Sequence, residues 1–209
     1  MKERPVIFNG EMVRAILDGR KTQTRRVMKP QPEPCYRGGH WWPSNAFKTM
    51  LHIEEQMQNG QGGWKGLAGD ACPFGQVGDR LWVRETWARY NIDQDAHDMA
   101  YRATTPDDWP KEGRWRPSIH MPRWASRITL EITAVRVERL NSIGDVEAMR
   151  EGIQNLTTCS HADFGIPGVV NAQHPVRAFQ LLWESIYGEE SWSANPWVWV
   201  IEFLRVEVK

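Results

Sequence analysis

The stretch Gly19-Arg20-Lys21-Thr22-Gln23-Thr24-Arg25-Arg26 decides how the rest of this chain is interpreted. Four of its eight residues carry a positive charge and two carry a hydroxyl group. A cluster of this kind can bind an anion, activate a nucleophile, or form a solvated basic edge. Charge alone favours the solvated edge, so the surrounding sequence has to distinguish these alternatives.

The residues before this stretch predict a short helix. Asn9 can serve as the N-cap, and Glu11 falls in the first turn, where an acidic side chain is favoured by the helix dipole. Gly19 provides the stop. The helix therefore ends directly before Arg20 and Lys21. The apolar residues that share one helical face are Val13, Ile16 and Leu17.

The stretch itself continues as a strand, predicted over residues 22–28. Side chains alternate between the two faces of a strand. This alternation divides the residues into two sets, with Thr22, Thr24 and Arg26 on one face and Gln23 and Arg25 on the other.

The other elements predict an α+β fold, because strands and helices do not strictly alternate. Further strands are predicted at 6–8, 81–87, 128–137 and 197–203. A helix capped by Asn141 or Ser142 presents Val146, Met149 and Ile153, and a last helix opened by His174 presents Ala178, Leu181, Leu182 and Ile186. We expect one domain over residues 1–209, built on a small, mainly antiparallel sheet or barrel with flanking helices.

Three long segments interrupt this pattern and are predicted as loop insertions, at about 30–77, 91–113 and 154–173. The first is rich in Pro, Gly and Gln and shows no sustained period. We interpret it as irregular, with one short helix near 47–57. Such loops are often binding loops or lids.

Composition indicates a globular cytoplasmic protein whose overall charge does not point to a polyanionic partner. Lys plus Arg and Asp plus Glu number 26 each, so contact with a nucleic acid depends on a local patch. No apolar run is long enough to cross a membrane, and the N-terminus lacks the apolar segment of a signal peptide. Three cysteines at irregular spacing argue against a disulfide framework. The twelve tryptophans fit either a core or base stacking.

The sequence lacks the motifs of a nucleotide triphosphatase, a serine hydrolase and a zinc site. Gly60-Gln61-Gly62-Gly63 has neither the preceding strand nor the Gly-Lys-Ser/Thr ending of a phosphate loop, and no serine lies in a nucleophile elbow. Cysteines and histidines do not occur as the paired units that carry a zinc prediction; those considered were Cys35, His40, Cys72, Cys159 and His161. No cofactor and no metal are therefore expected.

Lys21 and Thr24 are the residues best suited to chemistry. A lysine acts as a general base when its pKa falls towards neutrality, and burial and neighbouring cations both lower it. The hydroxyl of Thr24 would then be the nucleophile or an oxyanion donor. An acid must come from elsewhere. Glu147 and Glu151 lie four residues apart on the helix predicted at 145–152, so both point to one side of it. A solvated helix face is the alternative for this pair.

The stretch from Leu17 to Arg26 resembles the Gly-x-Lys-Thr-x-Thr-x-Arg signature of ASCH domains, in the PUA-like superfamily. Three other blocks agree with that pattern in order: 77–81, 140–153 and 197–203. The segments 82–87, 115–127 and 195–197 look like those of ASCH-like proteins encoded by phages and prophages, sometimes labelled morphogenetic. The matched blocks cover about half the chain, and the long loops are extra.

The resemblance implies a small PUA-like β-barrel whose cleft holds the Lys-Thr segment and binds RNA or a modified nucleoside or nucleotide. One small bacterial member removes the acetyl group from N4-acetylcytidine with a lysine, a threonine and a glutamate. These fall on Lys21, Thr24 and Glu151. Lys21 would activate Thr24, and Glu151 would transfer protons to the leaving amine. This chain is twice the length of that enzyme.

Three functions follow as hypotheses: a binding module for RNA or a modified nucleoside, an amidohydrolase using Lys21, Thr24 and Glu151, and a phage assembly protein. Binding is placed ahead of catalysis, and both ahead of assembly. The residues expected to contact a ligand are Arg20, Arg25, Arg26, Trp82, Arg84, Glu85, Trp87, Trp124 and Arg127. For the tryptophans, a place in the core is the alternative to stacking on a base.

Overall fold

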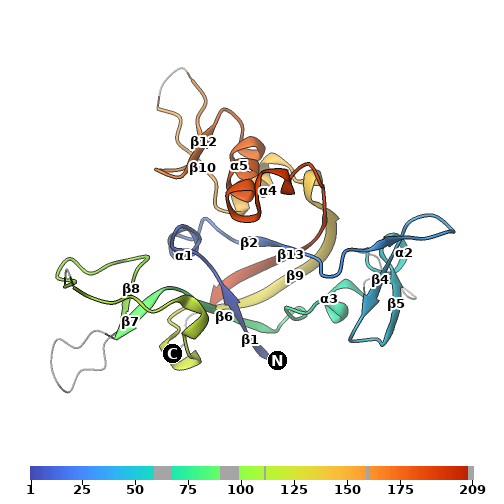
Figure 1. Ribbon diagram of the computed structural model, residues 1–209, viewed down its shortest axis with the longest axis horizontal. Helices are drawn as coiled ribbons and strands as arrows, with labels where there is room; N and C mark the ends of the chain where they lie inside the picture. Colours follow the sequence, from blue (N-terminus) through green and yellow to red (C-terminus); the bar gives the residue numbers. More distant parts are fainter. Residues whose placement is uncertain (59–66, 90–98, 111, 159–160, 207–209) are drawn as a thin grey trace.

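A computed structural model describes residues 1–58, 67–89, 99–110, 112–158 and 161–206 (Figure 1). Its centre is a five-stranded sheet in the order β1-β6-β9-β13-β2, in which only the β1–β6 pair is parallel. The bounds are β1 Glu3–Ile7, β2 Gln23–Val27, β6 Arg80–Arg84, β9 Thr129–Arg139 and β13 Trp197–Val206. The predicted α+β class with mainly antiparallel strands is confirmed.

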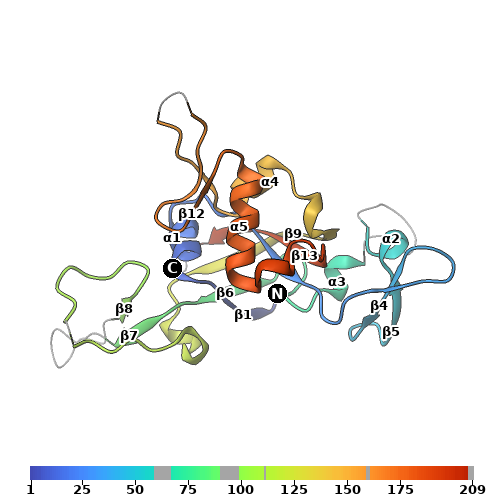
Figure 2. The same cartoon turned by 45° about the horizontal axis from the view of Figure 1, so that its top comes forward.

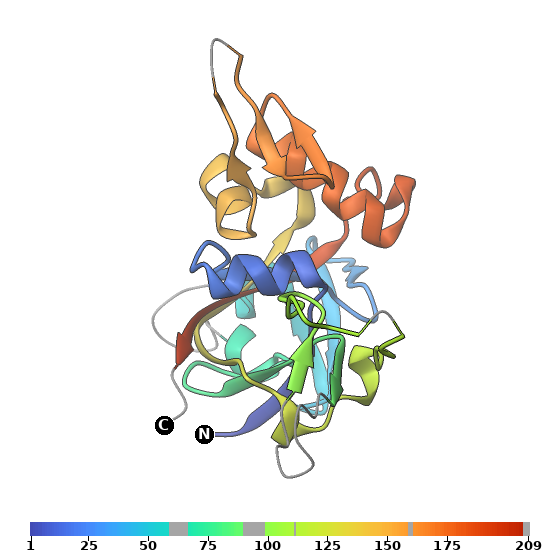
Figure 3. The same ribbon diagram turned by 90° about the vertical axis from the view of Figure 1, so that its left-hand side faces the viewer.

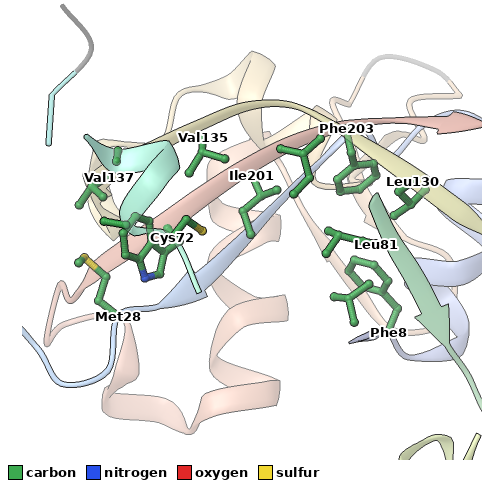
Figure 4. Packing of buried hydrophobic residues seen from close by; sticks show 14 of the residues in the cluster. Phe8, Met28, Cys72, Leu81, Leu130, Val135, Val137, Ile201 and Phe203 are labelled. Atoms are coloured by element: carbon green, nitrogen blue, oxygen red, sulfur yellow. The ribbon is translucent and has the colours of Figure 1, made fainter. Parts of the chain in front are cut away.

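The last strand organises the core because both of its faces are buried. Trp199, Ile201 and Phe203 of β13 enter one apolar cluster, which also takes Phe8 and Leu81 (Figure 4). Val198 and Val200 point the other way into a second cluster under the helices. An apolar run buried on both faces is typical of a central strand. The sheet therefore separates two cores.

Three helices flank the sheet: α1 (Gly10–Leu17), α4 (Asp145–Arg150) and α5 (Pro175–Tyr187). Helices α4 and α5 lie side by side over the second cluster (Figures 2 and 3), whereas Val13 and Ile16 of α1 pack into the first cluster. The start of α1 is as predicted, because the Asn9 side chain accepts a hydrogen bond from the Met12 N–H at 2.9 Å. Its end is also as predicted, since Gly19 adopts a positive φ of 73°.

Two predicted helix faces are wrong in part. Helix α4 is capped by Gly144, after a 3-10 turn, η3 (Leu140–Ser142), and not by Asn141 or Ser142. Val146 is 67% exposed, whereas Ala148 is the buried residue of α4 and Ile153 lies beyond its end. On α5, Ile186 is 45% exposed, and Phe179 and Trp183 are buried instead. These two aromatic residues lie four apart and define the face that packs on the sheet.

The three insertions are not irregular loops. The first holds an antiparallel sheet and two short helices: β3 (Glu33–Pro34), β4 (His40–Ser44), β5 (Thr49–His52), α2 (Ile53–Gln56) and α3 (Ala68–Ala71). Trp42 anchors it to the core, edge-on to Trp199 with ring centroids 5.4 Å apart. Strands this short carry little sequence period, so tertiary contacts decide them.

The other two insertions also form small antiparallel sheets. One pairs β7 (Trp87–Arg89) with β8 (Met99–Tyr101), and the other pairs β10 (Gln154–Asn155), β11 (Phe164–Ile166) and β12 (Val170–Ala172). Residues 90–98, 111 and 159–160 lie outside the described residues, and so does the predicted metal alternative at Cys159. In the described part of the chain, no helix has the length and apolarity needed to cross a membrane.

The two edge strands of the central sheet approach each other without pairing. The Arg26 guanidinium of β2 donates a hydrogen bond to the Ile7 carbonyl of β1 at 2.7 Å. Among the described residues no strand ladder joins β1 to β2, so the sheet is strongly curled but not a closed barrel. Four of the predicted site residues line the gap between these edges: Thr24, Arg25, Arg26 and Glu151.

Candidate functional site

A cavity of about 210 Å³ occupies the gap between β1 and β2. Helix α1 forms one wall and helix α5 another. The floor carries the polar groups of Thr24, Arg25, Arg26 and Glu151. The remaining lining is Ile7, Asn9, Met12, Phe179, Leu182, Trp183, Ile186 and Tyr187. An apolar cavity with a few convergent polar groups is the usual form of a small-molecule site. We call it the β1–β2 pocket.

Lys21 and Glu151 form a buried ion pair directly behind this floor. The Lys21 Nζ lies 2.8 Å from the Glu151 Oε2 and 2.9 Å from the Glu151 carbonyl oxygen. The exposed fractions of the two side chains are 0% and 3%. Two residues that the ASCH resemblance grouped are therefore in contact, and their burial excludes the solvated-face alternative for Glu151.

Local backbone geometry brings these two distant residues together. The Thr22 N–H donates to the Arg150 carbonyl at 2.9 Å, which ties the start of β2 to the end of α4. Gly152 adopts a φ of 109°, and a Cβ there would lie 3.2 Å from the Ala15 Cβ and 3.6 Å from the Lys21 Cβ. Glycine therefore permits both the turn after α4 and its close approach to α1.

Arg25 holds the second oxygen of Glu151. Its Nη1 lies 3.2 Å from the Glu151 Oε1, while its Nη2 contacts Glu147 at 3.0 Å and Glu138 at 3.1 Å. The Arg25 side chain has no exposed surface. Arg136 completes the network through contacts with Glu138 and Glu147. Arg25 therefore fixes the carboxylate of Glu151, and the expectation that Glu147 and Glu151 point to one side is confirmed.

Burial and charge act in opposite directions on the titration of Lys21. Burial lowers the pKa of Lys21, and the nearby Arg26 and Arg25 lower it further, against the opposing attraction of Glu151. For Glu147, burial raises the pKa, but the Gly144 N–H and the cations of Arg25 and Arg136 outweigh it and hold this pKa below its usual value. Lys21 therefore loses its proton more readily than a free lysine does.

Thr24 lies on the same floor and is 2% exposed. It pairs in register with Ile201 of β13, whereas Arg25 pairs with Val200, so the two side chains leave the strand on opposite faces. This confirms the predicted alternation of the strand. Because β2 is an edge strand of the sheet, side chains from both faces of β2 reach the pocket.

Arg26 closes one side of the pocket and Arg20 lies outside it. Arg26 stacks over the Phe8 ring at 5.1 Å, and its buried Nε has no hydrogen-bond partner. Arg20 instead donates to Asp18 at 2.8 Å and to the Gly152 carbonyl at 3.2 Å. It lines a separate hollow, so the structure does not place Arg20 with the other predicted ligand-binding residues.

The predicted residues around β6 and β7 do not reach the β1–β2 pocket. Trp87 is 2% exposed and belongs to a small core of its own. Glu85 is 1% exposed and pairs with Arg127 through two hydrogen bonds of 2.9 and 3.0 Å. Trp124 is 61% exposed and meets Trp87 edge-on. These four residues lie together beside the β7–β8 hairpin. There Trp87 serves as a core residue and Glu85 as the buried partner of Arg127, so neither needs a ligand to explain it.

Trp82 and Arg84 lie closer to the site, on the outer face of β6. The Arg84 guanidinium stacks over the Trp82 ring at 5.6 Å. Arg84 pairs in register with Ile7, which lines the β1–β2 pocket, and Arg84 itself lines an adjoining groove. These two residues are therefore neighbours of the pocket rather than part of it.

Sequence reasoning missed most of the apolar wall. Phe179, Trp183 and Tyr187 repeat every four residues along α5, and this spacing could have identified the wall. Met12 was on the predicted α1 but off its predicted face. No signal in the sequence pointed to Glu138, because its role depends on Arg25 from another strand.

Comparisons of the chain with protein-family models, with curated proteins and with solved structures found no match. Among the described residues, no group of three or more His, Cys, Asp or Glu side chains could hold a metal ion. Function is therefore inferred below from the geometry of the β1–β2 pocket and from the residues of the Lys-Thr segment.

Proposed function

We propose that the chain is an ASCH-like module of the PUA-like type, whose curled sheet binds the base of a modified nucleoside, free or within RNA, in the β1–β2 pocket. One observation carries this proposal: the buried Lys21–Glu151 ion pair lies next to an apolar cavity of about 210 Å³ with aromatic walls. Thr24 and Glu151 line this cavity, and Lys21 contacts Glu151 from behind its floor.

The pocket suits a flat, uncharged ring with polar edges. Its walls include the rings of Phe179, Trp183 and Tyr187, and aromatic side chains stack on bases. Its floor offers the hydroxyl of Thr24 and the carboxylate of Glu151, which bind the edge groups of a base. Because Lys21 and Arg25 match the charge of Glu151, the floor favours an uncharged group, and the base is the part expected to enter.

A binding measurement with one blocking variant tests this proposal. We expect N4-acetylcytidine to bind saturably, measured by calorimetry or by tryptophan fluorescence. Ile186→Arg places a long cation at the pocket wall and should abolish binding, because Ile186 is 45% exposed and tolerates the change. Val146→Arg is the matched control, an exposed apolar residue on α4 that does not line the pocket. Equal binding by both variants would contradict the proposal.

A second candidate function is hydrolysis of an amide on the bound base, favoured by the lowered pKa of Lys21 beside Glu151. In this reaction the Thr24 oxygen attacks the acyl carbonyl, and neutral Lys21 takes the hydroxyl proton. Lys21 passes that proton to the Glu151 carboxylate, 2.8 Å away, and Glu151 delivers it to the departing amine, which leaves as the free base. Water then cleaves the acyl–Thr24 ester, releasing the acid and restoring the hydroxyl.

Hydrolysis is tested by product analysis with variants at the two threonines. Thr24→Val removes the hydroxyl at nearly constant shape, so we expect it to abolish conversion of N4-acetylcytidine to cytidine while binding persists. Thr22→Val is the matched control, because Thr22 lies on the same segment but outside the pocket. Unchanged turnover by Thr24→Val would exclude Thr24 as the nucleophile, and no turnover by the native chain would leave binding as its function.

A further inference from the structure

A second groove adjoins the β1–β2 pocket. It has a volume of about 440 Å³ and shares Ile7, Arg26 and Tyr187 with the pocket. Its remaining lining is Pro5, Val6, Val27, Lys29, Phe74 and Arg84. A ligand seated in the pocket can therefore extend into this groove past Tyr187, which is 41% exposed.

The groove differs from the pocket in charge. Arg26, Lys29 and Arg84 supply three cations, and no carboxylate is among its lining residues. The buried Arg25, by contrast, is matched by the carboxylates of Glu138, Glu147 and Glu151. Within the described part of the chain, none of the three groove cations forms an ion pair with a protein carboxylate.

Unused hydrogen-bond donors accompany this unbalanced charge. The Nε atoms of Arg26 and Arg84 are both buried without a hydrogen-bond partner, as are those of Arg25 and Arg80 outside the groove. A buried donor without a partner is unfavourable, so an anion in the groove that accepted from Arg26 and Arg84 would remove that cost. Arginine is well suited to phosphate because its planar guanidinium can donate two parallel hydrogen bonds.

We infer that this groove is a phosphate subsite, so that the ligand of the β1–β2 pocket is a nucleotide rather than a nucleoside. The inference rests on the proposed function, because the base must occupy the pocket. The order of features along the surface matches that of a nucleotide. The apolar pocket takes the base, the Ile7 and Tyr187 boundary takes the sugar, and Arg26, Lys29 and Arg84 take the phosphate. The phosphate belongs either to a free mononucleotide or to a nucleotide within a strand.

The principal test compares N4-acetylcytidine with its 5′-monophosphate by calorimetry. We expect the monophosphate to bind about tenfold more tightly in the native protein, because charge-assisted hydrogen bonds are added. Arg84→Gln should bring the ratio of the two affinities close to one. Arg80→Gln is the matched control, because Arg80 lies on the same strand and face but lies near Glu131 at 3.7 Å and does not line the groove. This variant should retain the tenfold ratio.

A second measurement probes the groove without the pocket. Inorganic phosphate is titrated while the Nε–H resonances of the arginines are followed by NMR, and we expect those of Arg26 and Arg84 to shift. Equal affinities for nucleoside and monophosphate, with no shift of these resonances, would overturn the phosphate subsite and leave the pocket intact. Phosphate-induced shifts without nucleoside binding would instead contradict the proposed base pocket. A short single-stranded RNA oligomer distinguishes the two sources of the phosphate. Tighter binding of the oligomer than of the monophosphate, with a steep salt dependence, identifies a nucleotide within a strand. Binding no tighter than that of the monophosphate identifies a free mononucleotide.

Discussion

The buried Lys21–Glu151 pair makes a quantitative prediction about stability. Glu151→Gln removes the carboxylate that contacts both the Lys21 Nζ at 2.8 Å and the Arg25 Nη1 at 3.2 Å. Two buried cations then lose their shared partner. Removing one member of a buried ion pair costs about 3–5 kcal/mol. For a chain of this length, that loss corresponds to a fall in melting temperature of about 10 °C.

The complementary substitution should be milder. Lys21→Met leaves Glu151 paired with Arg25 and fills the space of the lysine stem with a similar apolar chain. We expect a loss of about 2 kcal/mol, the size of one hydrogen bond to a charged group. Glu11→Gln is the surface control: its ion pair with Arg14 is partly exposed, so its loss should cost less than about 1 kcal/mol.

The pH dependence of the Glu151→Gln variant has a definite sign. Burial lowers the pKa of Lys21 and Glu151 opposes that effect, so the substitution lowers this pKa further. The unfolded chain keeps the lysine protonated up to about pH 10.4. At pH values between the Lys21 pKa of the folded variant and that of the unfolded chain, the unfolded state binds more protons than the folded state. The free energy of unfolding of the variant therefore rises with pH in this range. The loss in the variant should therefore be larger at pH 6 than at pH 9.

Urea unfolding at both pH values, followed by tryptophan fluorescence, measures these differences. Glu151 has two buried cationic partners and Lys21 has one carboxylate, so a smaller loss of stability for Glu151→Gln than for Lys21→Met would contradict this prediction. A cost that is independent of pH would show that Lys21 does not titrate in the folded variant within this range.

Three further predictions concern the site and its support. If the chain hydrolyses N4-acetylcytidine, its rate should rise with pH as Lys21 loses its proton, at a lower pH than free lysine would require; a rate that is flat or falls with pH contradicts Lys21 as the base. Trp87→Ala should cost about 3–5 kcal/mol in a denaturant titration, because the ring is buried, and Trp124→Ala less than about 1 kcal/mol; similar losses would disprove their assignment to core and surface. Gly152→Ala should lower stability by at least about 1 kcal/mol in thermal melting, because its φ of 109° and the contact with α1 both disfavour a Cβ; no loss would indicate that the turn can relax.

Local features of the sequence located α1 and the strands of the central sheet, but not all strand bounds, because the predicted strand 81–87 is divided into β6 and β7, which belong to different sheets. Asn9 and Gly19 delimit α1, since capping depends on residues within one turn of the helix end. The alternation in the 22–28 segment separated Thr24 from Arg25 correctly, because a strand has a strict period of two. The apolar run that begins at Trp197 identified β13.

The short sheets of the insertions were beyond the reach of such patterns. Strands of two to five residues, such as β3 and β4, contain too few positions to show a period. What stabilises them is the packing of Trp42 against Trp199, a contact between residues far apart in the chain. Likewise, Val146 and Ile186 fit a helical period but face solvent, since the surface that each helix meets is set by the rest of the fold.

The sequence by itself determined that Lys21 and Thr24 share one segment and that Glu151 lies at the end of a helix. Only the tertiary structure decided that Lys21 and Glu151 are in contact, buried, and placed beneath an aromatic wall from α5. The physical reason is distance along the chain: 130 residues separate the two charges, and no local rule specifies their approach. The turn at Gly152 and the packing of three helices on the sheet bring them together, and that packing changes a basic segment into the floor of a pocket.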